Sequence, residues 1–188
     1  MSILKRCQWV DVKDPTMFTY HDKEWGVPIH NDDRLFEALS LEGAQAGLSW
    51  KTILHRRDAY RAAFANFNVD ACAAMTDSDL ESICVNTHVV RHRLKIFSVR
   101  HNAQVVQALK EKHISFTNYV WQWIGTQYEQ KDNMMPQDCN FEIAARMSKD
   151  LKKAGMLYVG PTIMHSFMQA VGMINDHEKD CFLNKLKI

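Results

Sequence analysis

Residues 41–50 read Leu-Glu-Gly-Ala-Gln-Ala-Gly-Leu-Ser-Trp and lie between two segments whose apolar side chains recur at helical spacing. Gly43 and Gly47 mark the end of the first helix, because glycine is favoured where a helix stops. Ser49 is a suitable N-cap for the helix that follows. The stretch is therefore predicted to connect two helices, and it carries a carboxylate, an amide and an indole in one short connection.

Helical spacing of apolar residues extends over most of the remaining chain. Asn31 or Asp32 can cap the helix that precedes the connection. The predicted helices cover about 32–42, 50–64, 69–75, 78–85, 90–110, 116–124, 141–154 and 161–171. Residues 1–31 are expected to be irregular with short helical turns, and 125–140 to form a mobile loop. No segment alternates for long enough to require a strand, so the predicted fold class is all-α.

Composition is that of an ordinary globular chain. The sequence has 188 residues, of which 46% are hydrophobic and 24% charged, with a formal net charge of +1. This length predicts a single domain, 1–188. There is neither an apolar run of membrane-spanning length nor the apolar core of a signal peptide, so we expect a cytoplasmic protein with no membrane partner. An odd number of cysteines, five, argues against a disulfide framework.

Basic residues gather in two places, although the net charge is near zero. Such patches can hold phosphates, but on charge alone two solvated helix faces are the better interpretation. The two clusters are Lys51, Arg56, Arg57 and Arg61, and Arg91, Arg93, Lys95 and Arg100.

Cysteine and histidine occur together at both ends of the chain. His177 and Cys181 are four residues apart and would point the same way from a helical turn. Cys7 and His21 stand near the other end, outside ordinary zinc-finger spacing. Spacing alone therefore favours a surface histidine beside a partly buried cysteine.

A second dense patch stands upstream, Tyr20-His21-Asp22-Lys23-Glu24-Trp25-Gly26-Val27-Pro28. Followed by 41–50, it resembles the 3-methyladenine DNA glycosylase I family, and the resemblance extends from Cys7 to Cys181. It implies a helix-hairpin-helix DNA glycosylase, with that element at about 78–101. The implied reaction is base excision repair: the enzyme binds alkylated double-stranded DNA, flips out N3-methyladenine and hydrolyses its N-glycosidic bond. A monofunctional, monomeric enzyme that releases 3-methyladenine is expected.

The same resemblance implies a metal site. The family has a zinc site built from an N-terminal Cys and His and a C-terminal His-x-x-x-Cys, and Cys7, His21, His177 and Cys181 match all four positions. One structural Zn²⁺ per chain would then join the two ends, with no open coordination position for chemistry.

The substrate sets the demands on a base pocket. An N3-alkylated adenine is cationic, so a pocket needs aromatic faces and a carboxylate. The resemblance assigns the catalytic contact to Glu42 and stacking to Trp50, with Tyr20 and Trp9 as further pocket residues. Without the resemblance, a solvated Glu42 is as good an interpretation as a functional one, Trp50 is better interpreted as a packing aromatic, and Tyr20 could simply pack beside His21. Ser166 either lines the pocket or lies in a helix–helix contact.

The DNA contacts implied by the resemblance lie in two segments. The hairpin before 90–110 would offer backbone N–H groups to a phosphate, with Arg91, Arg93 and Lys95 nearby. Gln45 or Leu48 would fill the gap left by the flipped base.

Two positions depart from the family pattern. His88 stands where the hairpin usually has glycine, and histidine tolerates a positive φ less well. Met17 stands where an aromatic residue is common, which puts the strength of base binding in doubt.

Two other functions remain open at this stage. One is a non-catalytic module that binds DNA or a free modified base, and the other is a metal-dependent hydrolase, against which the closed ligand set argues. A lyase activity would need an amine at the sugar, and Lys51 beside Trp50 is the only lysine close to the motif.

Overall fold

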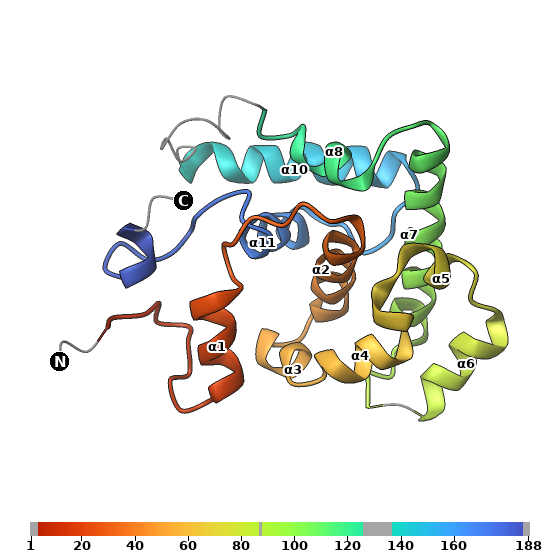
Figure 1. Cartoon of the computed structure of the whole chain (residues 1–188), viewed down its shortest axis with the longest axis horizontal. Helices are drawn as coiled ribbons and strands as arrows, with labels where there is room; N and C mark the ends of the chain where they lie inside the picture. Colours follow the sequence, from red (N-terminus) through yellow and green to blue (C-terminus); the bar gives the residue numbers. More distant parts are fainter. Residues whose placement is uncertain (1–3, 87, 126–136, 186–188) are drawn as a thin grey trace.

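The computed structural model describes residues 4–86, 88–125 and 137–185, and every regular element among them is a helix. The all-α prediction is confirmed for this part of the chain (Figure 1). The α-helices are α1 (Pro15–Lys23), α2 (Asp32–Gln45), α3 (Trp50–Leu54), α4 (Arg57–Ala63), α5 (Val69–Ala73), α6 (Asp77–Asn86), α7 (Arg93–Glu111), α8 (Phe116–Trp121), α10 (Gln137–Lys153) and α11 (Pro161–Ala170). Two short 3₁₀ helices are η1 (Ala65–Phe67) and η2 (Phe182–Lys185).

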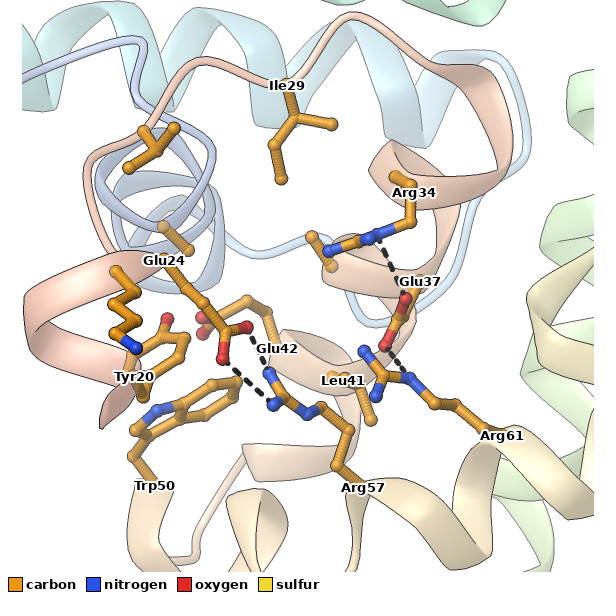
Figure 2. Close-up of a pocket in the computed structure, with 14 residues that line it drawn as sticks. Tyr20, Glu24, Ile29, Arg34, Glu37, Leu41, Glu42, Trp50, Arg57 and Arg61 are labelled. Carbon is orange, nitrogen blue, oxygen red and sulfur yellow. Dashed lines mark hydrogen bonds and ion pairs between the residues drawn. The ribbon is translucent and has the colours of Figure 1, made fainter. Parts of the chain in front are cut away.

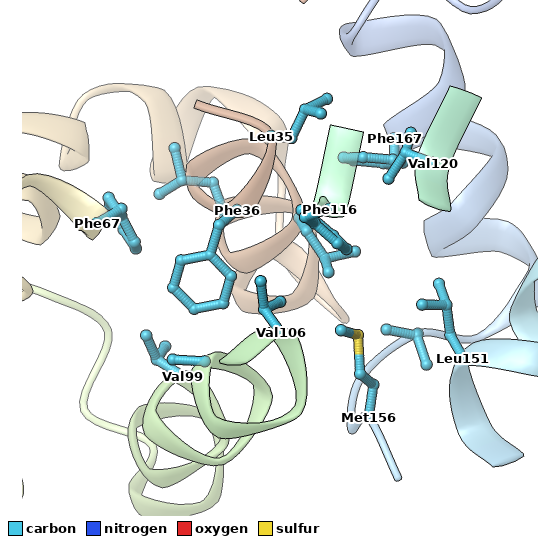
Figure 3. Packing of buried hydrophobic residues seen from close by; sticks show 14 of the residues in the cluster. Leu35, Phe36, Phe67, Val99, Val106, Phe116, Val120, Leu151, Met156 and Phe167 are labelled. Atoms are coloured by element: carbon cyan, nitrogen blue, oxygen red, sulfur yellow. The ribbon is translucent and has the colours of Figure 1, made fainter. Parts of the chain in front are cut away.

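Helix α2 lies at the centre of the molecule, in contact with α7, α8 and α11 (Figure 1). Asn31 caps it as predicted, because its side chain accepts a hydrogen bond from the Arg34 N–H at 3.0 Å. Its Phe36 packs with Val99 and Val106 of α7 (Figure 3). Burial of each such side chain contributes about 1.5–3 kcal/mol, so the position of α2 is fixed by the core itself.

The end of α2 differs from the prediction. Gly43 does not break the helix, which continues to Gln45 with Ala46 as C-cap. A Cβ on Gly43 would lie 3.2 Å from the Cβ of Tyr158, so the glycine allows a close approach between segments instead. Gly47, with φ of +79°, follows in the left-handed conformation that favours glycine.

The segment before α2 is also more regular than expected. Residues 15–23 form helix α1, where only short turns were predicted. Asp14 caps it, accepting from the N–H groups of Thr16 at 3.1 Å and Met17 at 3.3 Å. Pro15 occupies the first helical position, which suits its fixed φ. The pair Asp14-Pro15 was thus a helix-start signal that the sequence interpretation missed.

The helix predicted over 50–64 is divided into α3 and α4. Its start was correct, since Ser49 caps α3 and accepts from the Thr52 N–H at 3.3 Å. Of the predicted mobile loop, 126–136 lies outside the described residues and 137–140 belongs to α10.

The two ends of the described chain meet on one side of the molecule (Figure 1). The Phe182 N–H donates to the Lys5 carbonyl at 2.9 Å, and the Gln8 N–H donates to the Glu178 carboxylate at 2.9 Å. No helix within the described residues is both long enough and apolar enough to cross a membrane.

Candidate functional site

A pocket of about 140 Å³ opens between α1, α2, α3 and α4 (Figure 2). The segment between α1 and α2 and the end of α11 complete its wall. Its lining combines aromatic, apolar and charged side chains: Tyr20, Lys23, Glu24, Val27, Ile29, Arg34, Glu37, Ala38, Leu41, Glu42, Trp50, Arg57, Arg61 and Ala170.

Glu42 projects into this pocket from the last turns of α2 (Figure 2). The residue is only 5% exposed. Loss of solvation raises the pKa of its carboxyl group from 4.5 to about 8. The pocket therefore holds a buried carboxyl group whose ionised form would be stabilised by the arrival of a positive charge.

Tyr20 and Trp50 stand together beside Glu42 (Figure 2). Their ring centroids are 5.2 Å apart with a tilt of 47°. Burial raises the pKa of the Tyr20 phenol well above its usual value, with a further contribution from the charge of Glu42. The indole Nε1 of Trp50 is buried and has no hydrogen-bond partner among the described residues. Both predicted aromatic residues therefore line the pocket together with Glu42.

The other carboxylates of the pocket are each paired with arginine (Figure 2). Glu24 and Arg57 form a fork with N–O distances of 2.5 and 3.0 Å, which joins the end of α1 to the start of α4. Glu37 accepts from Arg61 at 2.7 Å and lies 3.4 Å from Arg34. Among the described lining residues, Glu42 is thus the carboxylate that no ion pair neutralises.

These pairs were missed by the sequence interpretation. Arg57 and Arg61 had been assigned to a basic cluster, either solvated or phosphate-binding, yet both line the pocket and both are bound to glutamates. Glu24 stands four residues after Tyr20 in the dense upstream patch, which was the one available signal.

Trp9 and Ser166 are not among the described residues that line this pocket. The ring of Trp9 lies edge-on to Trp25 at 5.0 Å and to Tyr20 at 6.4 Å, and the residue is 37% exposed. Ser166 is half-buried on α11, one turn before the lining residue Ala170. Met17 is buried in one cluster with Tyr20 and Leu54, against which Trp50 packs, so it belongs to the packing around the aromatic residues of the pocket.

A second group of polar side chains joins the chain ends. Cys7, His21, His177 and Cys181 are all buried, and their ligand atoms lie within 4.8 Å of one another. The Cys7 Sγ and His177 Nδ1 atoms are 3.5 Å apart, and Cys181 Sγ lies 3.5 Å from His21 Nε2. Two thiols and two imidazoles in this arrangement could hold a metal ion.

Neighbouring groups orient these side chains. His21 Nδ1 lies 2.7 Å from the Asp22 carboxylate, which Arg6 in turn binds at 2.6 Å. The Glu178 N–H donates to Cys7 Sγ at 3.3 Å. A carboxylate on the far nitrogen of a histidine is a common partner of metal-binding imidazoles.

The segment predicted to form the hairpin contains α6, the start of α7 and, between them, the described residues 88–92. Arg91 is exposed, whereas Arg93 binds Glu81 at 2.6 Å and lies over the Phe97 ring at 4.0 Å. Lys95 points to the end of α2, where its ammonium group contacts backbone carbonyls. His88 is exposed, and its carbonyl oxygen accepts a hydrogen bond from the Arg56 guanidinium.

The turn after α2 presents the predicted gap-filling residues. The Leu48 N–H donates to the Gln45 carbonyl at 2.6 Å, which closes a tight turn around Gly47. Leu48 is 40% exposed despite its apolar side chain, and Gln45 is half-buried. The turn therefore offers an apolar side chain to solvent next to the pocket helix.

Comparison with known proteins shows which family this chain resembles. The family model described as methyladenine glycosylase matches residues 9–184. The chain is 39% identical over 180 residues to DNA-3-methyladenine glycosylase 1 of Escherichia coli (strain K12), covering 95% of this chain and 96% of that protein.

Solved structures give the same result. A crystal structure of 3-methyladenine DNA glycosylase I superposes with a TM-score of 0.83 at 40% identity, covering 95% of this chain and 98% of the other. The Staphylococcus aureus 3-methyladenine DNA glycosylase I, studied for its recognition of 3-methyladenine, superposes with a TM-score of 0.82 at 31% identity, covering 96% of each chain.

Proposed function

The chain belongs to the methyladenine glycosylase family, and from this membership we propose that it excises N3-methyladenine from alkylated double-stranded DNA. Its curated relatives are DNA-3-methyladenine glycosylases, which are hydrolases acting on N-glycosyl bonds in DNA repair. The proposed reaction flips the damaged base into the pocket and hydrolyses the bond to C1′, with no lyase step.

The unpaired carboxylate of Glu42 is the observation that carries this proposal. The other pocket glutamates, Glu24 and Glu37, are neutralised by arginines, and Glu42 is desolvated without a cation. A cationic base would pair with the ionised form of Glu42, whereas beside a neutral base the buried group keeps its proton and gains no ion pair. Selection for charged lesions follows from this difference.

Tyr20 and Trp50 support the same proposal because they offer aromatic faces beside Glu42. A cationic base stacked on them gains a cation–π contribution of about 0.5–2 kcal/mol. The positive charge already weakens the glycosidic bond, so a strong general acid is unnecessary. Glu42 stays close to the departing base while water attacks C1′. The pocket stabilises the cationic transition state more strongly than it stabilises unmodified DNA. Trp9 supports Tyr20 from the side, and we assign Ser166 to the helix packing around the pocket.

DNA would be held by two features around the pocket. The N-terminus of α7 and the exposed Arg91 suit a backbone phosphate, with Arg93 beside them. The exposed Leu48, with Gln45 at the base of its turn, suits the space that the flipped base leaves in the stack.

Zinc fits the Cys7, His21, His177 and Cys181 cluster. In a tetrahedral site with bonds of about 2.3 Å to sulfur and about 2.0 Å to nitrogen, neighbouring S and N ligands lie about 3.5 Å apart. The S–N distances of 3.5, 3.5 and 3.6 Å match that value. The four ligands would fill the coordination sphere, so the ion would stabilise the joined chain ends and take no part in hydrolysis.

A monofunctional reaction is supported by the surroundings of Lys51. Its ammonium group lies 3.0 Å from the Asp11 carboxylate and 3.1 Å from that of Asp14. Hydrogen bonding to both acids raises its pKa, which keeps the amine protonated and unsuited to attack on a sugar.

The proposal is tested by base release from methylated duplex DNA, with each released base identified chromatographically. We expect release of 3-methyladenine well above the enzyme-free rate, little release of 7-methylguanine, and no borohydride-trapped adduct on abasic DNA. Binding of the DNA without base release by folded, metal-loaded protein would identify a binding module instead. An efficient adduct abolished by Lys51→Met would refute the monofunctional assignment.

A further inference from the structure

Lys95 lies in the first turn of α7, but its ammonium group does not face solvent as a phosphate ligand would. Nζ donates to the carbonyls of Ala44 at 2.9 Å and Ala46 at 2.5 Å. These carbonyls belong to the last turn and C-cap of α2, where helical carbonyls lack intrahelical partners. A cation at a helix C-terminus also interacts favourably with the helix dipole, so Lys95 caps the Ala44 and Ala46 carbonyls, while local turns bind those of Gly43 and Gln45.

Helix α7 holds the same end of α2 by a second route. Asn102 of α7 exchanges two hydrogen bonds with the backbone of Leu157, at 3.0 and 2.8 Å. The next residue, Tyr158, packs against Gly43, where no Cβ would fit without displacement. The C-terminal end of α2 therefore has two contacts that depend on α7. Lys95 of α7 binds its carbonyls directly, and Tyr158, whose neighbour Leu157 is bound by Asn102 of α7, packs against Gly43.

The held end of α2 carries the groups on which the proposed reaction depends. Glu42 immediately precedes Gly43, and the turn bearing Leu48 begins at Gln45. Lys95 itself is two residues after the start of α7, the end proposed to face DNA. The Lys95 side chain thus connects the N-terminal end of α7, which is proposed to bind DNA, with the C-terminal end of α2, which carries Glu42.

We propose that Lys95 is a positioning residue that fixes Glu42 and the 45–48 turn relative to the DNA-bound end of α7. This inference rests on the proposed glycosylase function, and it replaces the sequence-based assignment of Lys95 to a DNA phosphate. Two roles predict different results. A phosphate ligand contributes to the salt dependence of DNA binding, whereas a positioning residue contributes to the rate of excision after binding.

The test compares wild type with Lys95→Met, which keeps the stem of the side chain and removes its donors. Three quantities are measured: hydrogen exchange of the 43–50 amides without DNA, the salt dependence of binding to duplex with a stable abasic analogue, and the single-turnover excision rate at saturating enzyme. We expect faster exchange in 43–50, an unchanged salt slope, and excision slower by about tenfold or more, since small displacements of reacting groups have large effects on rate.

Two further variants serve as controls. Lys95→Arg keeps donors at the end of a long side chain, and it should recover most of the protection of 43–50 and part of the excision rate. Arg91→Met removes an exposed charge from the same region, and it should show the opposite pattern. Its salt slope should fall by about 0.9, the value for one lost phosphate contact on duplex DNA, with exchange in 43–50 unchanged.

Either of two results would overturn the inference. One is a salt slope for Lys95→Met that falls by about one contact, and the other is unchanged exchange in 43–50. Both are read without base release, so they remain decisive even if wild type proves inactive. An inactive wild type would count against the proposed function, and a slow Lys95→Met with an active wild type would support the positioning role.

Discussion

At the scale of single residues, the glutamates of the pocket differ in whether an arginine neutralises them. Glu24 and Glu37 are bound by Arg57 and Arg61, over sequence separations of 33 and 24 residues. Glu42 is buried without such a partner, which raises its pKa to about 8. The sequence could identify Glu42 through its motif, but the arginine pairs depend on packing between helices that no local pattern encodes.

The desolvation of Glu42 makes stability depend on pH. Because its pKa is higher in the folded state than in the unfolded chain, the carboxyl group costs nothing below about pH 4.5 and its full ionisation penalty above about pH 8. A shift of this size corresponds to about 5 kcal/mol. Glu42→Gln should therefore gain stability relative to wild type between about pH 5 and about pH 9. Urea unfolding of both proteins at the two pH values measures this gain, and a difference that stays constant with pH would contradict it.

At the scale of elements, the N-caps of α2 and α3 were more predictable than the contacts between elements. Asn31 and Ser49 cap α2 and α3 as their sequence positions indicate, because a cap depends on residues three or four apart. Gly43 was expected to end α2, and instead it allows Tyr158 to approach. A glycine that ends a helix and one that admits a neighbour look alike in a sequence, since the neighbour lies far along the chain.

Gly172 provides an element-scale prediction, because it lets the end of α11 approach the segment that lines the pocket. A Cβ there would lie 2.4 Å from the backbone nitrogen of Pro28, and its φ of +75° is left-handed. Gly172→Ala should destabilise the protein by about 2–5 kcal/mol through the sum of overpacking and backbone strain. It should also weaken base binding, because Val27 and Ile29 line the pocket.

The matched control is Gly125→Ala, where φ is +67° and no atom of the described residues lies within 4 Å of the added Cβ. Backbone strain alone should then cost about 1–2 kcal/mol. Urea unfolding of both variants separates overpacking from backbone strain. Equal losses of stability would show that the contact with Pro28 does not contribute to the destabilisation of Gly172→Ala.

At the scale of the whole molecule, the chain ends form one cluster. Cys7 and His177 are 170 residues apart in sequence, and their ligand atoms are 3.5 Å apart. Spacing alone could not predict this, because ligands on separate segments follow no fixed interval. The family resemblance named the four residues, and the structure brings them together.

The cluster yields a prediction for the stability of the whole chain. Wild type should contain about one zinc per chain, and Cys181→Ser should lose the metal and melt about 10 °C lower or more, since structural zinc contributes directly to folding free energy. Cys84→Ser, a thiol removed outside the cluster, should keep both metal and melting temperature. Elemental analysis measures the zinc content and thermal unfolding measures the melting temperature. The assignment would be refuted if wild type contained no metal and Cys181→Ser were as stable as wild type.

Recognition of a cationic base by the desolvated carboxyl group of Glu42 is best tested by the pH dependence of 3-methyladenine release by wild type and Glu42→Gln. Rates are measured under conditions that report kcat/KM, which senses ionisations of the free enzyme. For wild type we predict a rise with pH that levels off above about 8, as Glu42 ionises. For Glu42→Gln we predict a rate lower by about tenfold or more and flat across the same range. Equal rates with the same pH profile would show that Glu42 does not recognise the cationic base.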